Sequence, residues 1–226
     1  MKTVSILDLL KSGAHFGQVK SKRYPKMDKY IFGVKDGVHI IDLEKTIESL
    51  EKASEFVKKI IANKGKILFV GTKRQAKAIV KEFAESINMP YVISRWLGGT
   101  FTNFDNIIRL PNKMKKLEED MANGVYEKYT KKEKLMIERE IAKLKEMVEG
   151  IRDLNGIPQA IFVVDINYEK TAVTEAKERK IPVIAIADTN TNPELVDYPI
   201  PANDDSVNTL KLILSVFKES INEAKK

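Results

Sequence analysis

The 226-residue sequence has no cysteine, a single tryptophan and only two histidines. A chain without cysteine forms no disulfide, no thiolate zinc site and no cysteine nucleophile. Long apolar runs are also missing, since no stretch approaches the roughly 18 residues that a membrane helix needs. Asp8 and Lys11 interrupt the leucines near the N-terminus, so no signal peptide is expected. These absences predict a cytoplasmic protein with no membrane partner.

Residue sets that commit a protein to catalysis are missing as well. The sequence offers no acid–base pair, no Ser-His-Asp set and no metal-ligand spacing. His15 has no second ligand at a metal-binding distance along the chain, so we expect a packed or hydrogen-bonded side chain there. We therefore predict no catalytic residue, no metal, no cofactor and no small-molecule substrate.

Positive charge is what the chain has in excess, with 39 Lys and Arg against 32 Asp and Glu and a net charge of +7. Such an excess favours polyanionic partners. The cations are clustered, which predicts two surfaces directed at a polyanion. Residues 20–29 hold Lys20, Lys22, Arg23, Lys26 and Lys29 against one acid, Asp28. Residues 64–81 hold Lys64, Lys66, Lys73, Arg74, Lys77 and Lys81 and no acid.

Short apolar segments alternate with amphipathic ones along most of the chain, which predicts a three-layer α/β sandwich with a parallel sheet of about five strands. A loop rich in proline and asparagine is expected at 189–203. The expected strands are 38–41, 66–71, 91–93, 160–164 and 183–187. The expected helices begin at Ser5, Asp42, Lys73, Tyr168 and Asp204, and end at Gly13, Gly65, Ile87, Arg179 and Ala224.

A charged segment with heptad spacing interrupts this alternation. Ile107, Leu110, Met114, Leu117 and Met121 are spaced 3, 4, 3 and 4, and a second run from Ile137 to Ile151 follows. Asn123-Gly124 and a Thr130–Glu133 capping box separate the runs, which predicts an inserted antiparallel coiled-coil hairpin. Pro111 should kink the first helix or mark its start.

The predicted domains follow from this interruption. Residues 1–105 and 152–226 form an α/β RNA-binding domain, with 1–36 as an N-terminal arm, and 106–151 form the hairpin. Most charged residues of the hairpin are expected to be a solvated face. Arg109, Lys131 and Lys132 are the cations of this segment that we expect to contact RNA.

The stretch from Arg95 to Phe104 lies where the chain enters the hairpin. It combines a Gly98-Gly99 pair with the only tryptophan, two phenylalanines, an arginine and small polar residues. This mixture suits a surface that stacks on bases and bonds to phosphates, with Arg95, Trp96, Thr100 and Asn103 as the candidate contacts. A hinge packed by its own aromatic rings is the alternative, because aromatic rings are more often core residues.

The strand-to-helix turn at Gly71 is a second candidate site. Such turns bind phosphate in α/β folds through the free N–H groups of the helix N-terminus. Lys73, Arg74 and Lys77 fall in the first turn of the expected helix, a poor position for cations unless an anion lies nearby. The turn lacks the later glycines of dinucleotide-binding motifs and the Walker Gly-Lys-Thr. RNA phosphate is the predicted ligand, and merely solvated cations are the alternative.

Asp165 and Asp188 both follow apolar strands, at what should be the carboxyl edge of the sheet. Carboxylates there could hold magnesium or accept a phosphoryl group, as in receiver domains. The stronger interpretation is that Asp165 and Asp188 cap the turns or helices that follow, and Asp204 resembles a helix start. A phosphate-handling enzyme is therefore only the alternative function.

The motifs taken together resemble the family of the second protein of the bacterial small ribosomal subunit, S-two. The resemblance runs from Met1 to about Phe217. It departs from the family pattern at Gln18, where histidine is usual, and at Arg23-Tyr24, where Trp-Asn is usual. The motifs that carry it, in order, are Gly13-Ala14-His15-Phe16-Gly17, Tyr24-Pro25-Lys26-Met27, Gly71-Thr72-Lys73-Arg74, Arg95-Trp96-Leu97-Gly98-Gly99-Thr100, Asp188-Thr189-Asn190 and Asn203-Asp204-Asp205.

The resemblance implies a flavodoxin-like domain with an inserted coiled-coil hairpin and a non-enzymatic role in translation. It implies binding to small-subunit ribosomal RNA between head and body on the solvent side, as part of a ribonucleoprotein. Neighbouring small-subunit proteins are the other implied partners, among them the mRNA-binding protein S-one, which family members help to recruit. Gln18 weakens any histidine-based metal site, and Arg23 adds a cation that should strengthen phosphate contact.

Overall fold

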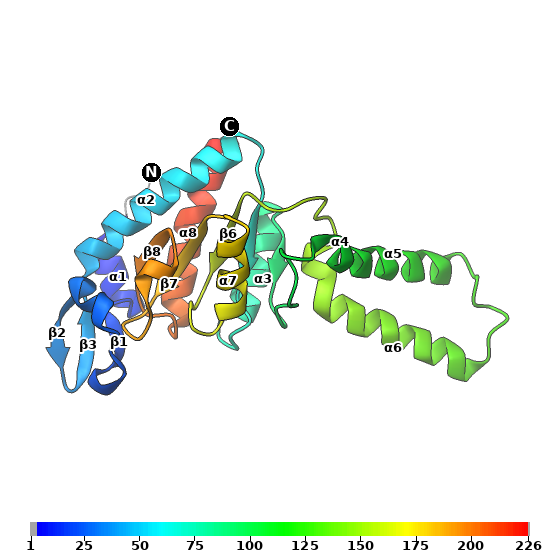
Figure 1. Ribbon diagram of the computed structural model, residues 1–226, viewed down its shortest axis with the longest axis horizontal. Helices are drawn as coiled ribbons and strands as arrows, with labels where there is room; N and C mark the ends of the chain where they lie inside the picture. Colours follow the sequence, from blue (N-terminus) through cyan, green and yellow to red (C-terminus); the bar gives the residue numbers. More distant parts are fainter. Residues whose placement is uncertain (1–3, 226) are drawn as a thin grey trace.

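A computed structural model describes residues 4–225, and its centre is a sheet of five strands. The strand order is β5-β4-β6-β7-β8, and every neighbouring pair is parallel (Figure 1). The strands are β4 (Ile67–Val70), β5 (Tyr91–Val92), β6 (Ala160–Val163), β7 (Val183–Ala187) and β8 (Tyr198–Pro201). The parallel α/β class expected from the sequence is confirmed.

Two hydrophobic clusters cover the two faces of this sheet, because successive residues of a buried strand point to opposite sides. Phe69 and Phe162 pack on one side with the helices α1 (Ile6–Ser12), α2 (Leu43–Ala62), α3 (Lys77–Ile87) and α8 (Val207–Ala224). Leu68 and Ile161 pack on the other side with α7 (Lys170–Glu178) and with parts of the hairpin. The result is the expected three-layer sandwich.

The membership of the sheet differs from the prediction at two strands. Residues 38–41 belong to a separate antiparallel sheet of order β1-β3-β2, formed by β1 (Phe16–Val19), β2 (Ile31–Lys35) and β3 (Val38–Ile41). The turn between β2 and β3 explains this, since Asp36 and Gly37 have φ of 52° and 77° and close a tight hairpin. The fifth parallel strand, β8, lies inside the predicted loop, and its Pro199 and Pro201 are tolerated because β8 is an edge strand.

Several helix ends are where the sequence predicts them, and others are shifted. The Ser5–Asp8 and Thr130–Glu133 capping boxes form, and Asp42 caps α2. In contrast, α2 ends at Ala62, α3 begins at Lys77 and α8 begins after Ser206. Short 3₁₀ helices complete the arm and the connections: η1 (Lys20–Lys22), η2 (Pro25–Tyr30), η3 (Glu149–Ile151) and η4 (Pro193–Leu195). None of the helices in residues 4–225 is long and apolar enough to cross a membrane.

The insertion consists of α4 (Phe104–Ile107), α5 (Arg109–Ala122) and α6 (Lys131–Val148), with α5 and α6 side by side and projecting from the body (Figure 1). Pro111 is the third residue of α5 and therefore marks a helix start. The inner end of the hairpin is part of the main core, because four of its residues are buried in the cluster that covers the sheet. They are Met114, Leu144, Val148 and Ile151.

Candidate nucleic-acid interface

The turn after β4 already holds an anion, and that anion is a side chain of the protein. Glu169, which directly precedes α7, accepts hydrogen bonds from the Thr72 backbone N–H and from Thr72 Oγ1, both at 2.6 Å. Glu169 is only 3% exposed, and burial raises the pKa of its carboxyl. Glu169 thus accepts a backbone N–H at the turn where the sequence predicted a phosphate, and α3 itself starts four residues later than expected.

Lys73 is directed into the protein rather than toward an external ligand. Its Nζ lies 2.7 Å from Asp205, 2.9 Å from Asp204 and 3.3 Å from Asp165. Burial lowers the pKa of Lys73, but hydrogen bonds to Asp205 and Asp204 outweigh it, so the net pKa is raised. Lys73 is therefore a structural cation in this conformation. Arg74 is exposed and Lys77 half-buried, and neither forms an ion pair within residues 4–225.

Asp188, Asp204 and Asp205 gather at the carboxyl edge of the sheet, with oxygens within 4.8 Å of one another. That spacing fits a cation, and Lys73 supplies a positive charge to Asp204 and Asp205. Gln18 ties the arm to this edge, since its Nε2 donates to Asp188 at 3.0 Å and to Asp205 at 3.1 Å. Burial, together with repulsion from Asp165 and Asp188, raises the pKa of Asp204 to about 8.

The three interpretations of these aspartates as caps have different outcomes, and among the backbone N–H groups of the described chain the Asp188 side chain accepts only from that of the next residue, Thr189. Asp165 does cap the next turn, because its Oδ1 accepts from the backbone N–H groups of Asn167 and Tyr168 at 2.8 and 3.0 Å. Asp204 does not start α8, because Ser206 takes that role and accepts from the Thr209 N–H. Asp204 is 2% exposed, and its carboxylate faces Lys73 instead.

Of the two alternatives for residues 95–104, the structure shows the packed one. Trp96 is 8% exposed and meets Phe101 edge to face, with ring centroids 5.0 Å apart. Its indole N–H donates to Glu175 at 3.1 Å, and the Gly99 and Phe101 N–H groups donate to the same carboxylate at 2.8 and 2.9 Å. A ring held in this way presents no face to a base, so stacking by Trp96 would require the loop to leave this packing.

The other candidates in this loop divide between interior and surface. Thr100 is 2% exposed, and its hydroxyl donates to the Leu97 carbonyl, so it is turned inward. Asn103 is exposed, and its Oδ1 accepts from Asn106. Arg95 is exposed and forms no ion pair among the described residues. The loop therefore offers Arg95 and Asn103 to a partner.

The arm shows the same division. Arg23 pairs with Asp28 at 3.0 Å, and Lys26 pairs with Glu194 on η4. Lys20 and Lys22 are exposed and have no ion pair in the part of the chain that the structure describes. In the hairpin, Arg109, Lys131 and Lys132 are exposed. Lys131 and Lys132 begin α6 at the end of the hairpin away from the body, so the predicted contacts are spread over the whole molecule (Figure 1).

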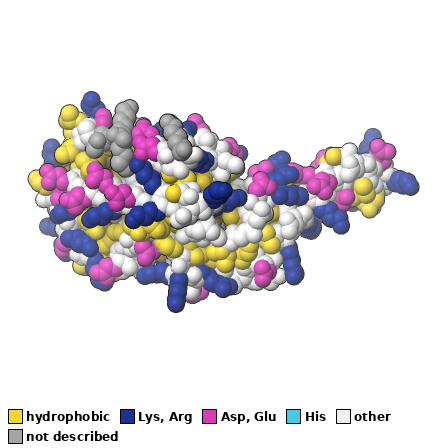
Figure 2. Space-filling view, turned by 90° about the horizontal axis from the view of Figure 1, so that it is seen from above, with side chains coloured by type: hydrophobic (Ala, Val, Ile, Leu, Met, Phe, Trp, Pro, Cys, Tyr) yellow, Lys and Arg dark blue, Asp and Glu magenta, His cyan; other side chains and the backbone are white. Residues whose placement is uncertain are grey.

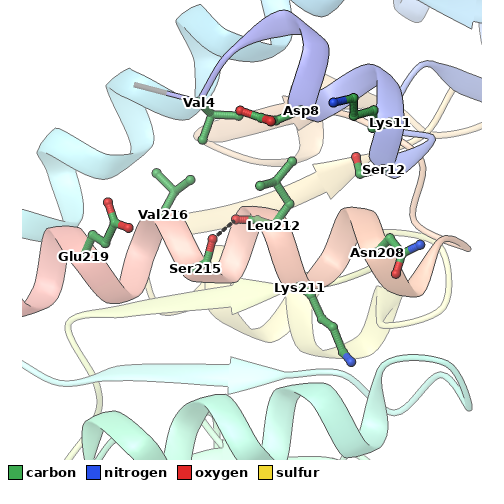
Figure 3. A pocket seen from close by; sticks show the side chains of 10 residues that line it. All are labelled: Val4, Asp8, Lys11, Ser12, Asn208, Lys211, Leu212, Ser215, Val216 and Glu219. Carbon is green, nitrogen blue, oxygen red and sulfur yellow. Dashed lines mark hydrogen bonds between the residues drawn. The ribbon is translucent and has the colours of Figure 1, made fainter. Parts of the chain in front are cut away.

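The surface seen in Figure 2 carries Lys, Arg, Asp and Glu interspersed, and both signs continue along the hairpin. A groove with a volume of about 520 Å³ lies between α1 and α8, away from the loops that hold the predicted RNA-binding residues. Figure 3 shows Val4, Leu212 and Val216 between the two helices and both signs of charge around them. None of the predicted RNA-binding residues lines this groove.

Sequence reasoning missed the two residues that organise the site, Glu169 and Glu175. Glu169 directly precedes α7 and Glu175 lies on it, and each accepts hydrogen bonds from one of the two predicted RNA-binding loops. An acid in an amphipathic helix is normally expected to face solvent. The one available signal was Trp96, because a buried indole N–H usually requires an acceptor.

Comparison with known proteins identifies the family. A sequence profile described as "Ribosomal protein S2" matches residues 9–224. The chain belongs to the ribosomal protein S2 family. It is 47% identical over 224 residues to the small ribosomal subunit protein uS2 of Fusobacterium nucleatum, with 99% of this chain and 91% of that protein covered. The uS2 of Hahella chejuensis is 46% identical over 220 residues, with 97% and 87% covered.

Membership in the S2 family makes the chain a structural component of the small ribosomal subunit in the cytoplasm and not an enzyme. The resemblance stated from the motifs is thereby confirmed. The alternative of a phosphate-handling enzyme built on Asp165 and Asp188 is not supported. Both carboxylates have internal partners. Asp165 pairs with Lys73 and accepts from the Asn167 N–H, and Asp188 accepts from Gln18 and from the Thr189 N–H.

Proposed function

We propose that this S2-family chain binds small-subunit ribosomal RNA through phosphate contacts from the cations that form no ion pair within the described protein, between head and body on the solvent side of the subunit. The observation that carries the proposal is the division of the cations into two groups. Lys73, Arg23 and Lys26 have carboxylate partners inside the protein. The remaining predicted cations, which form no ion pair among residues 4–225, are Lys20, Lys22, Arg74, Lys77, Arg95, Arg109, Lys131 and Lys132.

A cation without an internal partner gains most from a phosphate, because it loses no ion pair on binding and releases counterions from the RNA. Arg74 and Lys77 are the sharpest case. Arg74 lies in the turn whose Thr72 N–H donates to Glu169, Lys77 begins α3, and both side chains reach solvent. The sequence predicted phosphate contacts from Lys73, Arg74 and Lys77, and we now propose them for Arg74 and Lys77 alone.

The test is rebinding to small subunits from which the S2 protein has been removed, measured at several salt concentrations. The double change Arg74→Ala with Lys77→Ala should weaken binding and flatten the plot of log affinity against log salt by about 0.7 to 0.9 for each lost contact. Lys211→Ala with Lys218→Ala removes the same charge from exposed positions on α8 and is the matched control. Equal slopes for the two double variants, with both proteins folded, would refute the phosphate contacts at this turn.

We also propose that the chain helps to recruit the mRNA-binding protein S-one. This part is supported by the family resemblance. Subunits reconstituted with and without the chain should differ in the amount of S-one that sediments with them. Equal amounts of S-one in the two preparations would remove this part of the proposal and leave the RNA contacts untouched.

A further inference from the structure

The strand order of the parallel sheet creates a topological switch point between β4 and β6. From β4 the chain goes to β5 on one side, and after the hairpin it returns to add β6 on the other side of β4. The helix after β4, α3, packs on one face of the sheet, and the helix after β6, α7, packs on the other (Figure 1). In open α/β sheets, ligands bind outside the carboxyl ends of the strands at such a point.

The inner part of this switch point is filled by side chains of the protein. The Glu169 carboxylate accepts hydrogen bonds from the Thr72 N–H and hydroxyl, and Lys73 Nζ lies 3.3 Å from Asp165. These contacts join the turn after β4 to the turn after β6. A partner that approaches the switch point therefore meets only the outer surface of the two turns.

Tyr168 lies on that surface, in the turn that leads into α7, and is 60% exposed. Its backbone N–H donates to Asp165 Oδ1 at 3.0 Å, and the next residue, Glu169, is buried. The preceding residue, Asn167, donates from its side chain to the Asn190 carbonyl at 3.1 Å. The backbone is thus held on both sides of an exposed ring, which lowers the ordering cost of binding through that ring.

Three cations belong to the same two turns and to the helices that follow them. Arg74 is exposed in the turn after β4, and Lys170 is exposed as the first residue of α7. Lys77 begins α3, and its charge lowers the pKa of the nearby Glu169 carboxyl, against the larger rise that burial causes. None of these cations forms an ion pair within residues 4–225. Because Asp165 and Glu169 are buried, the exposed charge of the two turns is positive.

An exposed ring on a surface with exposed cations matches the chemistry of a nucleotide. The ring can stack on a base, and the cations can contact the phosphates that adjoin it. A base within a duplex has no free face, so the matching ligand is an unpaired one. An apolar protein surface would leave Arg74 and Lys170 without a counter-charge, which makes RNA the better match.

We propose that Tyr168 stacks on an unpaired RNA base at the switch point of the sheet, while Arg74 and Lys170 contact the phosphates next to that base. This inference rests on the RNA-binding function proposed above and adds to it an aromatic contact and a further cation. The sequence placed the stacking residue at Trp96, whose ring is packed inside the loop before the hairpin. The partner is held outside the crevice because Glu169 and Lys73 fill its inner part.

The first experiment is again rebinding to small subunits depleted of the S2 protein, at several salt concentrations. Tyr168→Ala and Tyr168→Leu should both weaken binding by about 5- to 150-fold with an unchanged salt slope, because each removes one base stack. Tyr168→Phe keeps the ring and should bind like wild type. Lys170→Ala should flatten the salt slope by about 0.7 to 0.9. Wild-type affinity for Tyr168→Leu would overturn the stacking, and an unchanged slope for Lys170→Ala would overturn its phosphate contact.

Ile157→Ala is the matched control. Ile157 is 40% exposed just before β6, whereas Tyr168 follows β6, so the two side chains lie at opposite edges of the sheet. Neither side chain is buried, and both Ala variants should unfold like wild type. The control should also bind like wild type. Equal losses of affinity in Ile157→Ala and Tyr168→Ala would overturn a specific contact at the switch point.

The second experiment is photo-crosslinking of Tyr168→p-benzoylphenylalanine in the reassembled subunit. An adduct with RNA supports the inference, whereas an adduct with a protein, or no adduct, overturns it. If the Tyr168 and Lys170 variants bind like wild type while the Arg74 and Lys77 double variant does not, only this inference fails and the RNA-binding function stands.

Discussion

The carboxyl edge of the parallel sheet and the helical hairpin are both rich in charge, but they use it in opposite ways. At the sheet edge, Glu169 and Glu175 are at least 93% buried and hold the backbone of two loops. In the hairpin, pairs such as Lys113–Glu140 join side chains that are about half exposed. A carboxylate that is buried and accepts several hydrogen bonds therefore fixes the local structure of this protein, whereas an exposed charged side chain remains available to a partner.

The comparison also explains which of the predicted RNA-binding cations are left without an ion pair inside the protein. Lys73 forms ion pairs with Asp165, Asp204 and Asp205, while Arg74, the next residue, reaches solvent. Adjacent cations in one motif thus have different roles. The spacing of residues along the chain does not distinguish them, because the carboxylates that decide the matter come from segments about 90 to 130 residues away.

The largest effect is expected from removing the hairpin at its inner end. If the heptad residues of the hairpin buried only one another, replacing residues 107–151 by a linker would leave a folded body. We expect instead that this deletion abolishes cooperative folding of the body, because the segment includes Met114, Leu144 and Val148, which are buried in the core. Each such loss typically costs about 2 to 5 kcal/mol, against a total stability of about 5 to 15 kcal/mol.

Thermal unfolding by circular dichroism would check this expectation. Replacing only residues 118–140 by a short turn removes the outer hairpin and spares the buried residues, so this protein should still melt cooperatively. A cooperative transition in the larger deletion as well would show that the body closes its core without the hairpin.

The second effect is expected at Glu175. Glu175→Ala leaves the N–H groups of Trp96, Gly99 and Phe101 without their acceptor and should cost at least about 3 kcal/mol in the free energy of unfolding. Urea unfolding measures this cost, and Trp96 emission should shift to the red because the loop opens. Glu178→Ala, exposed on the same helix, is the control and should cost about 0.5 kcal/mol or less. Equal costs would contradict the anchoring role of Glu175.

The third effect separates two neighbouring glycines of the same loop. Gly99 has φ of +91°, and an added Cβ would lie 3.2 Å from the Cβ of Asn103. Gly98 has an ordinary φ and open space around the Cβ position. Gly99→Ala should therefore cost about 1 to 2 kcal/mol in unfolding free energy, and Gly98→Ala close to nothing. If Gly98→Ala instead weakens rebinding to depleted subunits without a change in stability, this loop approaches RNA closely.

The fourth effect is a dependence of stability on pH. Burial raises the pKa of Asp204 to about 8 in the folded protein, well above its ordinary value of about 3.9. Between these two values the folded state binds more protons than the unfolded state, so stability falls as pH rises, by at most about 1.4 kcal/mol per pH unit. Asp204→Asn should lessen this decline in unfolding experiments between pH 5 and 8. Parallel curves for the two proteins would show that Asp204 is ionised throughout.

The smallest effect is expected in the hairpin, between Lys113 and Glu140. Their side chains are 56% and 45% exposed, so water and salt screen the pair. A double-mutant cycle with Lys113→Ala and Glu140→Ala should give a coupling energy of about 0.5 kcal/mol or less. A coupling above 2 kcal/mol would remove the distinction between the hairpin and the sheet edge.

Local signals in the sequence were sufficient where the determining contacts are near in the chain. The capping boxes at Ser5 and Thr130 form as predicted, because cap and partner lie three residues apart. The buried strands β4, β6 and β7 were also predictable, since each is a continuous apolar run between turn signals. The same signals failed for β8, whose two prolines are typical of a loop unless the strand lies at an edge.

The sequence by itself determined the α/β class, the hairpin and the family, because hydrophobic periodicity, caps and ordered motifs are all local properties of the chain. Only the tertiary structure decided which charged residues face inward. Glu175 meets Trp96 from 79 residues away, and Lys73 meets Asp204 from 131 residues away. Burial of a charge depends on what packs against it, so the same lysine that is a phosphate ligand on a bare turn becomes a structural cation beside three carboxylates.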